Sequence, residues 1–256
     1  MRYYFLGCAL PSLSFNKPPE ISSEELTSYF KLNLSHSDIK KNKTLRSYID
    51  LYNLKAYWEG RPIDHRGNLN EKEIEEALLT KDVLAPYVFN FLTDNETIED
   101  KLLNFPKLLQ HFYKNQIDEN EGFLKSYFSF EREVNLVLLA LRAKSYNKDI
   151  AYELRFEDSK DFLVSYILSQ KDMVTFEPML EHKFLKKLFE EYKNLPDKLY
   201  KAILEYKFNH LQKLYEKTYF SIDQLLAYTA MLIISEEVYY VNKQEGKEIV
   251  DELLRG

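Results

Sequence analysis

One apolar pattern with helical spacing runs without interruption from Glu121 to Lys144. Its members recur at steps of mostly three or four residues, which is the period of an α-helix, and they are Phe123, Tyr127, Phe130, Val134, Val137, Leu138 and Leu141. An unbroken helix of this length makes six to seven turns and is about 36 Å long. Because so long an apolar stripe needs other elements to cover it, the pattern predicts a central helix.

The rest of the chain favours helices as well. No segment alternates apolar and polar residues between turn signals in the way that a strand does. Glycine, which supplies the tight turns of β-rich folds and the loops that hold phosphates, occurs only 6 times in 256 residues. The sequence therefore predicts an all-α fold. Residues 2–10 are too few to decide between an extended and a helical segment, and residues 149–157 are interpreted as mainly helical.

Capping residues and prolines indicate where individual helices begin. Ser22 and Glu25 have the spacing of a capping box, and so do Asn70 and Glu73. Ser37 or Asp38 is expected to cap a long helix that ends at Gly60, Pro86 to start a short one, and Pro106 to kink or divide a helix over 96–117. The remaining helices are predicted near 23–34, 159–169, 177–193, 197–217, 221–243 and 247–254.

A short motif recurs where long helices are expected to end. Residues 144–154 align without a gap with residues 243–253, and five positions are identical. Asn147 aligns with Gly246, and both residue types tolerate the left-handed conformation that terminates helices. A weaker copy begins at Gly60. The alternative interpretation is that the motif is no internal repeat, because any helical hairpin uses the same residue types to end one helix and start the next.

The motif copies at Gly60, Asn147 and Gly246 predict three pseudo-repeated helical units that together form a funnel-like or curved bundle. The expected units are an N-terminal one over 1–80, a central one over 81–170 and a C-terminal one over 171–256. The boundaries are approximate and are compatible with packing into one domain.

Charge and hydropathy exclude several classes of partner. The net charge is −6 and lysine and glutamate are interspersed, which disfavours a nucleic-acid surface. Cys8 is the one cysteine, so no internal disulfide forms and the cytoplasm is the expected location. The longest apolar stretch, 225–234, is shorter than the ~20 residues that span a bilayer. No transmembrane segment is predicted.

No local pattern indicates catalysis. The five histidines lack the spacing of metal ligands, and neither a phosphate-binding loop nor a serine elbow is present. The acidic pairs Glu24-Glu25 and Glu236-Glu237 are interpreted as solvated helix faces. We therefore predict no catalytic, cofactor-binding or metal-binding residues and no enzymatic activity. The alternative is an enzyme whose site assembles from carboxylates and histidines that are far apart in the sequence.

Four segments carry a resemblance to a known family. They are the helix end Leu141-Arg142-Ala143-Lys144, the run Ile222-Asp223-Gln224-Leu225-Leu226-Ala227-Tyr228 followed by a long helix, the run from Arg46 to Lys55 with its acidic-x-x-Asn-Leu pattern, and the opening Tyr3-Tyr4-Phe5-Leu6 with Leu10-Pro11-Ser12-Leu13. The chain resembles the C-subunit family of V/A-type rotary ATPases. It is most similar to a shorter, uncharacterised family that is encoded beside V-type ATP synthase genes. In the C-terminal copy of the helix-end pattern, Val241 stands where the family would have an arginine.

The resemblance implies a non-catalytic component of the central stalk. Members of the C-subunit family form a socket that joins the axle to the membrane rotor ring. The implied partners are the axle subunits and the ring, with no nucleic acid and no cofactor, and the implied location is the cytoplasmic side of the membrane, held there by protein contacts. The alternative is a free helical scaffold or a regulatory module that binds other proteins.

Basic residues near the helix ends are the candidate contacts with such partners. They are Lys55, Arg142, Lys144 and Lys243. The alternative role for each is structural, because basic side chains also stabilise the carboxyl ends of helices.

Overall fold

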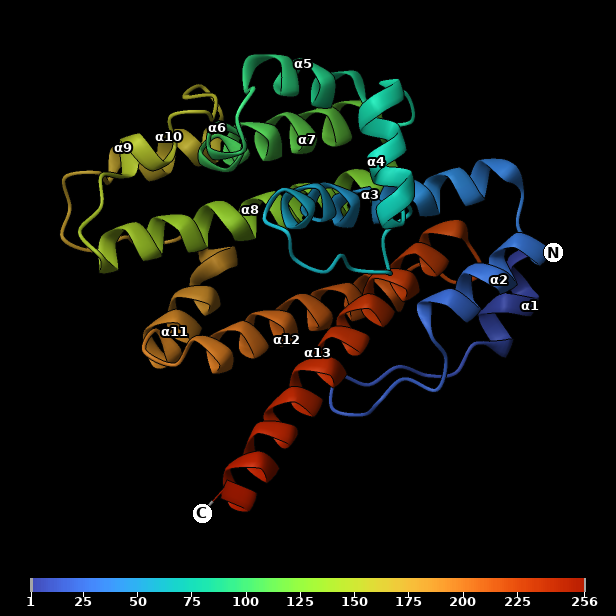
Figure 1. Cartoon of the computed structure of the whole chain (residues 1–256). Helices are drawn as coiled ribbons and strands as arrows, with labels where there is room; N and C mark the ends of the chain where they lie inside the picture. The colour runs from blue at the N-terminus through green and yellow to red at the C-terminus, as the bar shows by residue number, and fades with distance from the viewer. Residues whose placement is uncertain (1, 256) are drawn as a thin grey trace. The chain divides into compact units, whose positions relative to one another are not determined.

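The computed structural model describes the backbone of residues 2–255 and the side chains of residues 3–242. Every regular element in that part of the chain is a helix, and it contains no strand (Figure 1). The all-α prediction is confirmed. The helices are α1 (Arg2–Ala9), α2 (Ser23–Asn33), α3 (His36–Trp58), α4 (Glu71–Thr80), α5 (Pro86–Asp94), α6 (Ile98–Leu103), α7 (Phe105–Glu119), α8 (Gly122–Ser145), α9 (Ile150–Glu153), α10 (Phe162–Ser169), the 3-10 helix η1 (Leu180–His182), α11 (Lys183–Tyr192), α12 (Pro196–Tyr215) and α13 (Ile222–Arg255).

Most of the predicted helix starts are confirmed. Ser22 and Asn70 each form a complete capping box at the starts of α2 and α4. The predicted division at Pro106 falls between α6 and α7, where the proline occupies the first turn of α7. The first turn suits proline because its missing N–H would have no intrahelical partner there.

Three local predictions need correction. The cap of α3 is Ser35 rather than Ser37 or Asp38, since the Ser35 Oγ accepts a hydrogen bond from the Asp38 N–H at 3.3 Å. In residues 149–157 only α9 is helical, and residues 154–156 form a turn. The predicted end at Gly246 is absent because α13 continues to Arg255. A glycine inside a helix costs only about 1 kcal/mol, and its neighbours here are good helix formers.

The described residues form two compact units. Unit 1 combines residues 1–45 with residues 194–256, and unit 2 is residues 46–193. Unit 1 therefore joins the two ends of the chain, which is not visible from local sequence patterns. The three pseudo-repeated units remain a prediction.

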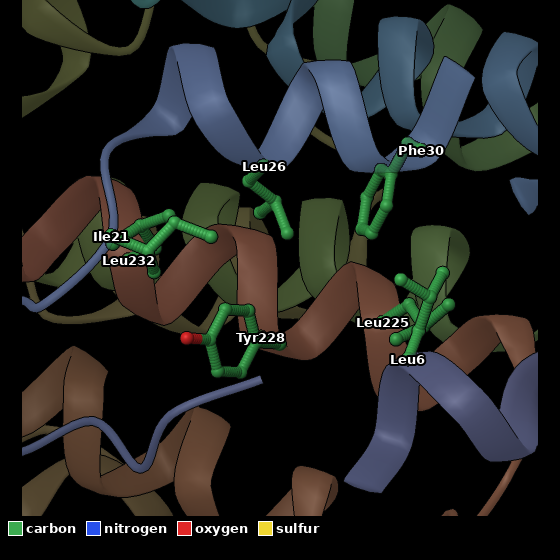
Figure 2. Close-up of a cluster of buried hydrophobic side chains, with 7 residues drawn as sticks. All are labelled: Leu6, Ile21, Leu26, Phe30, Leu225, Tyr228 and Leu232. Carbon is green, nitrogen blue, oxygen red and sulfur yellow. The ribbon is translucent and has the colours of Figure 1, made fainter. Parts of the chain in front are cut away.

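Unit 1 has its core where the N-terminal helices meet α13. Figure 2 shows side chains from both ends of the chain converging there. Three of them lie on one face of α13 at helical spacing, and the cluster comprises Leu6, Ile21, Leu26, Phe30, Leu225, Tyr228 and Leu232. The Tyr228 hydroxyl also donates to the Pro11 carbonyl at 2.9 Å. Because burying each such side chain stabilises by about 1.5–3 kcal/mol, this cluster fixes the N-terminal segment on α13.

A buried carboxylate reinforces the same junction. Glu236 on α13 accepts a hydrogen bond from the Ser23 N–H at 2.7 Å and another from the Ser23 hydroxyl at 2.5 Å. Both residues are buried. A negative charge at this position also interacts favourably with the amino end of the α2 dipole. The interpretation of Glu236 as part of a solvated face is therefore wrong.

Unit 2 is built around α8, as the long apolar pattern predicts. α8 packs against α7, α9, α10 and α11, and its fully buried side chains include Phe128, Val134 and Val137. The side chains of Trp58 and Phe91 stack elsewhere in the unit with their ring centroids 6.2 Å apart. The aromatic residues in unit 2 thus serve mainly as core.

A polar clamp holds the loop that follows α3. The Asp50 carboxylate accepts hydrogen bonds from the Asn68 N–H at 2.6 Å and the Leu69 N–H at 3.1 Å. Asn53 exchanges two bonds with the Asp64 backbone, at 2.8 and 2.9 Å. Burial raises the pKa of the Asp50 carboxyl, against the opposing effect of these bonds. The two helix residues thereby fix the course of residues 61–69.

Candidate partner interface at the end of α8

Two long helices end in the same way. At the end of α8, Asn147 has φ 53°, the Lys148 N–H donates to the Ala143 carbonyl at 2.8 Å, and the Asn147 N–H donates to the Lys144 carbonyl at 3.2 Å. At the end of α3, Gly60 has φ 65° and residues 56–61 repeat both bonds at 2.8 and 3.1 Å. This is the Schellman arrangement. The predicted ends at Gly60 and Asn147 are confirmed.

Lys144 ties the last turn of α8 to a second segment. Its ammonium donates to the Lys171 carbonyl at 2.6 Å and also to the Met173 carbonyl. Both carbonyls follow the end of α10, where backbone acceptors have no helical partner. This predicted interface residue therefore has a structural role, and it brings residues 171–174 beside the α8 terminus.

Exposed basic and apolar side chains gather around this tie. Tyr146 is 66% exposed and Val174 is 92% exposed, and the side chain of Arg142 is exposed as well. Tyrosine, arginine and methionine are enriched in protein contact surfaces. We call this set the α8-end surface, and define it as Arg142, Tyr146, Lys148, Tyr152, Met173 and Val174.

An ion-pair network supports the chain that returns from α9 to α10. Arg132 on α8 donates to the Glu157 carboxylate at 2.6 Å and to the Asp161 carboxylate at 3.0 Å. Burial alone would lower the pKa of the Arg132 guanidinium, but the two carboxylates raise it. Asp161 also caps α10 through the Leu163 N–H. This network fixes the segment between α9 and α10 to α8.

Of the other predicted interface residues, Arg142 belongs to this surface and Lys55 does not. Lys55 lies near the end of α3, with its ammonium 5.2 Å from the centroid of the Phe105 ring and 3.9 Å from the Glu59 carboxylate. It therefore contributes to packing within unit 2. The side chain of Lys243 lies outside the described residues. Arg142 is exposed at the end of α8, and its role in an interface stays a prediction.

Unit 1 carries a separate exposed aromatic cluster. The rings of Tyr4 and Phe220 are 5.0 Å apart, and Phe5 and Tyr219 are also exposed. Phe220 has φ 51°, a conformation that costs a non-glycine residue about 1–2 kcal/mol. Gly7 leaves room for its ring, because a Cβ there would lie 3.2 Å from the Phe220 ring. No local sequence pattern indicates this arrangement.

The polar side chains that the structure describes do not assemble a metal site. Among the residues described, no group of three or more histidine, cysteine or acidic side chains is arranged to hold a metal ion. His182 is buried, and its Nε2 lies 3.2 Å from the Glu133 carboxylate. Over the same residues, no helix combines the length and apolar character needed to cross a membrane.

The fold and the α8-end surface thus define an all-helical protein with an exposed basic and apolar surface at the end of its central helix. The chain belongs to the family described as "Protein of unknown function (DUF2764)", whose pattern matches residues 1–256. It is similar to an uncharacterised protein of Chlamydia muridarum, with 28% identity over 261 residues that cover 100% of this chain and 98% of the relative.

Two further relatives also align with this chain over almost its whole length. An uncharacterised protein of Chlamydia pneumoniae is 28% identical over 258 residues, covering 98% of this chain and 97% of the relative. One of Chlamydia trachomatis is 26% identical over 259 residues, covering 99% and 97%. No solved structure matches the chain.

Replacing Lys144 by methionine is expected to loosen residues 171–175. The aliphatic part of the side chain is kept, while two hydrogen bonds from a charged donor are lost, so the expected loss of stability is about 1–2 kcal/mol. Hydrogen exchange at residues 171–175 should accelerate. Lys148→Met is the matched control, because the Lys148 side chain is 63% exposed and its nearest carboxylate, Glu153, is 3.9 Å away. Equal exchange in the two variants would contradict the tie.

Proposed function

We propose that this protein is a non-catalytic rotor adaptor of a V/A-type rotary ATPase, which links the axle subunits to the membrane rotor ring. It would lie on the cytoplasmic side of the membrane and be held there by protein contacts. The observation that carries the proposal is the resemblance of two helix ends to the C-subunit family. Those ends, at residues 46–60 and 141–147, share one cap geometry.

The mechanical properties of the fold support the proposal. An adaptor in a rotor has to transmit torque, and a flexible connection would lose that torque as deformation. α8 has 24 residues and α13 has 34, which correspond to about 36 and 51 Å of continuous helix. Close-packed interiors are also nearly incompressible. The Arg132 network on α8 and the Glu236 contact on α13 each fix a neighbouring segment to a long helix, which suits that mechanical role.

A native purification tests the proposal. An affinity-tagged copy is expressed in its own host, membranes are solubilised gently, and the tagged protein is isolated with whatever is bound to it. The expected result is co-purification of the axle subunits and the rotor ring in a fixed ratio. An intact ATPase that lacks this protein, together with elution of the protein in another complex, would contradict the proposal.

A free helical scaffold is the second candidate function. The exposed rings of Tyr4, Phe5, Tyr219 and Phe220 favour it, because an aromatic cluster of this kind suits protein binding outside a motor as well. The same purification distinguishes the two functions. A scaffold would be recovered with another partner and without the rotor ring.

A further inference from the structure

We propose that unit 1 binds the surface of an anionic lipid bilayer through exposed rings on α1 and on the turn that leads into α13. We call these rings the aromatic surface and define it as Tyr4, Phe5, Tyr219 and Phe220. The rings would enter the headgroup region, and basic residues beside them would lie against the lipid phosphates. The inference does not depend on the proposed rotor function.

α1 is attached to the protein by one face and presents an uncharged face on the other side. Leu6 is buried in the cluster that Figure 2 shows. Tyr4 and Phe5 are each 61% exposed. Cys8 is also exposed, and it lies one helical turn beyond Tyr4 on the same face. Residues 3–9, the part of α1 whose side chains are described, include no charged residue.

The turn before α13 adds two rings to this face. Tyr219 is 68% exposed and Phe220 is 47% exposed. The centroid of the Phe220 ring lies 5.0 Å from that of Tyr4 and 6.5 Å from that of Tyr219, so the rings form one continuous patch. The Phe220 N–H donates to the Gln224 side chain at 2.7 Å, which fixes the turn on α13. Rings that are already ordered lose less conformational entropy on binding.

The segment that carries α1 is basic, although the chain is acidic. The whole chain has 41 acidic and 35 basic residues and a net charge of −6. Residues 1–19 nevertheless contain no acidic residue, and their charged residues are Arg2 and Lys17. Anionic lipids attract lysine and arginine and repel carboxylates. The charge of this segment is therefore complementary to an anionic bilayer.

The turn contributes one more basic residue. Lys217 is exposed, and it is the single charged residue within 217–222. Carboxylates border this stretch at Glu216 and Asp223, and the Glu216 carboxylate accepts a hydrogen bond from the Gln212 side chain at 3.1 Å. The two rings of the turn thus have a cation and no carboxylate between them in the sequence.

The chemistry of the aromatic surface favours lipid as its occupant. At a bilayer interface a tyrosine buries its ring and keeps its hydroxyl among the headgroups, while phenylalanine adds apolar area. No residue whose side chain is described hydrogen-bonds to the hydroxyl of Tyr4 or Tyr219, so both hydroxyls are available to headgroups. A second copy of the chain suits the surface less, because its basic residues would then meet their own like charges.

Flotation with lipid vesicles tests the inference. The full-length protein is mixed with vesicles of phosphatidylcholine that contain about 30% phosphatidylglycerol, and the bound fraction is measured against lipid concentration. We expect Phe5→Ser with Tyr219→Ser to weaken binding by about tenfold or more, because two rings no longer bury apolar area. Omitting phosphatidylglycerol should weaken wild-type binding by about fivefold or more, because the basic residues lose their attraction.

Tyr239→Ser with Tyr240→Ser is the matched control. Both rings are exposed on α13, at 43% and 56%, and they lie roughly 25 Å along that helix from Ile222. The control should bind within about twofold of wild type, and thermal melts should show that both double variants fold. Equal binding by the folded aromatic-surface variant and the control would overturn the inference. Failure of wild type to float with either kind of vesicle would overturn it as well.

The single cysteine gives a second measurement that needs no substitution. Cys8 is exposed on the same face of α1, so a nitrobenzoxadiazole dye attached to it should enter the interface with the rings. We expect its emission to move to shorter wavelength with vesicles and to be quenched by phospholipids that carry a nitroxide on the acyl chain. Emission that responds to protein concentration and not to vesicles would overturn the inference and assign the surface to a second copy. None of these results decides the rotor proposal, which the native purification tests.

Discussion

Replacing Gly67 by alanine is expected to destabilise unit 2 by about 2–4 kcal/mol. A Cβ at this position would lie 2.7 Å from the Asn53 Nδ2 and 2.7 Å from the Asp50 Oδ1. Both distances are far shorter than van der Waals contact, so the atoms have to separate. The cost depends on which hydrogen bonds this separation breaks.

The two atoms in the way are the ends of the clamp. Asp50 and Asn53 are buried on α3, and each already binds backbone groups of the loop. Moving Asp50 away would leave the N–H groups of Asn68 and Leu69 without their acceptor. Moving the loop instead would break the bonds from Arg46 to the carbonyls of residues 66 and 67. Either adjustment therefore costs several hydrogen bonds.

Gly60→Ala is the control for Gly67→Ala, because it separates steric from conformational cost. Gly60 has φ 65°, and nothing lies within 4 Å of a Cβ placed there. Its replacement should cost only about 1 kcal/mol, from the left-handed backbone. Urea unfolding followed by the fluorescence of Trp58, the single tryptophan, reports on unit 2. A smaller loss for Gly67→Ala than for Gly60→Ala would show that the clamp does not restrain the loop.

Helix features that depend only on residues close together in the sequence can be predicted from the sequence. The apolar stripe of α8 is continuous over the whole helix, so its extent could be inferred directly from the 3.6-residue period. The capping boxes at Ser22 and Asn70 involve residues three apart, and the ends at Gly60 and Asn147 depend on one backbone angle each. Each of these caps and ends is decided by residues within about one turn of helix.

Most of the features that the sequence does not indicate depend on distant residues. Unit 1 joins both ends of the chain, and no pattern within a short window specifies which segments meet. The hydrogen bonds of Lys144 could not be inferred from the sequence, because its partners, the carbonyls of Lys171 and Met173, lie 27 and 29 positions away. Gly246 resembled a helix end by composition alone, and the strong helix formers around it outweigh its propensity. The place of Arg142 at a helix end could be inferred from sequence, but not which neighbours complete its surface.

Replacing Glu236 by alanine is expected to destabilise unit 1 by about 2–4 kcal/mol. The change removes the acceptor of two buried donors, the Ser23 N–H and the Ser23 hydroxyl, which lie 2.7 and 2.5 Å from the carboxylate. Neither donor can reach water without α2 moving from α13. The charge that interacts with the α2 dipole is lost as well. Hydrogen exchange over residues 23–33 should accelerate, and urea unfolding followed by circular dichroism gives the loss of stability.

Glu236→Gln should retain most of the contact. Its amide oxygen can accept from the Ser23 N–H, and its amide nitrogen can donate to the Ser23 Oγ, so the expected cost is about 1 kcal/mol. Glu237→Ala is the neighbouring control: it removes an exposed bond of 3.1 Å from the Tyr200 hydroxyl and should cost less than about 1 kcal/mol. If exchange in α2 were as slow in Glu236→Ala as in Glu237→Ala, the apolar cluster around Tyr228 would hold the chain ends together without the carboxylate. If stability instead rises from Glu236→Ala to Glu236→Gln and then to wild type, the buried acceptor at position 236 holds that junction together.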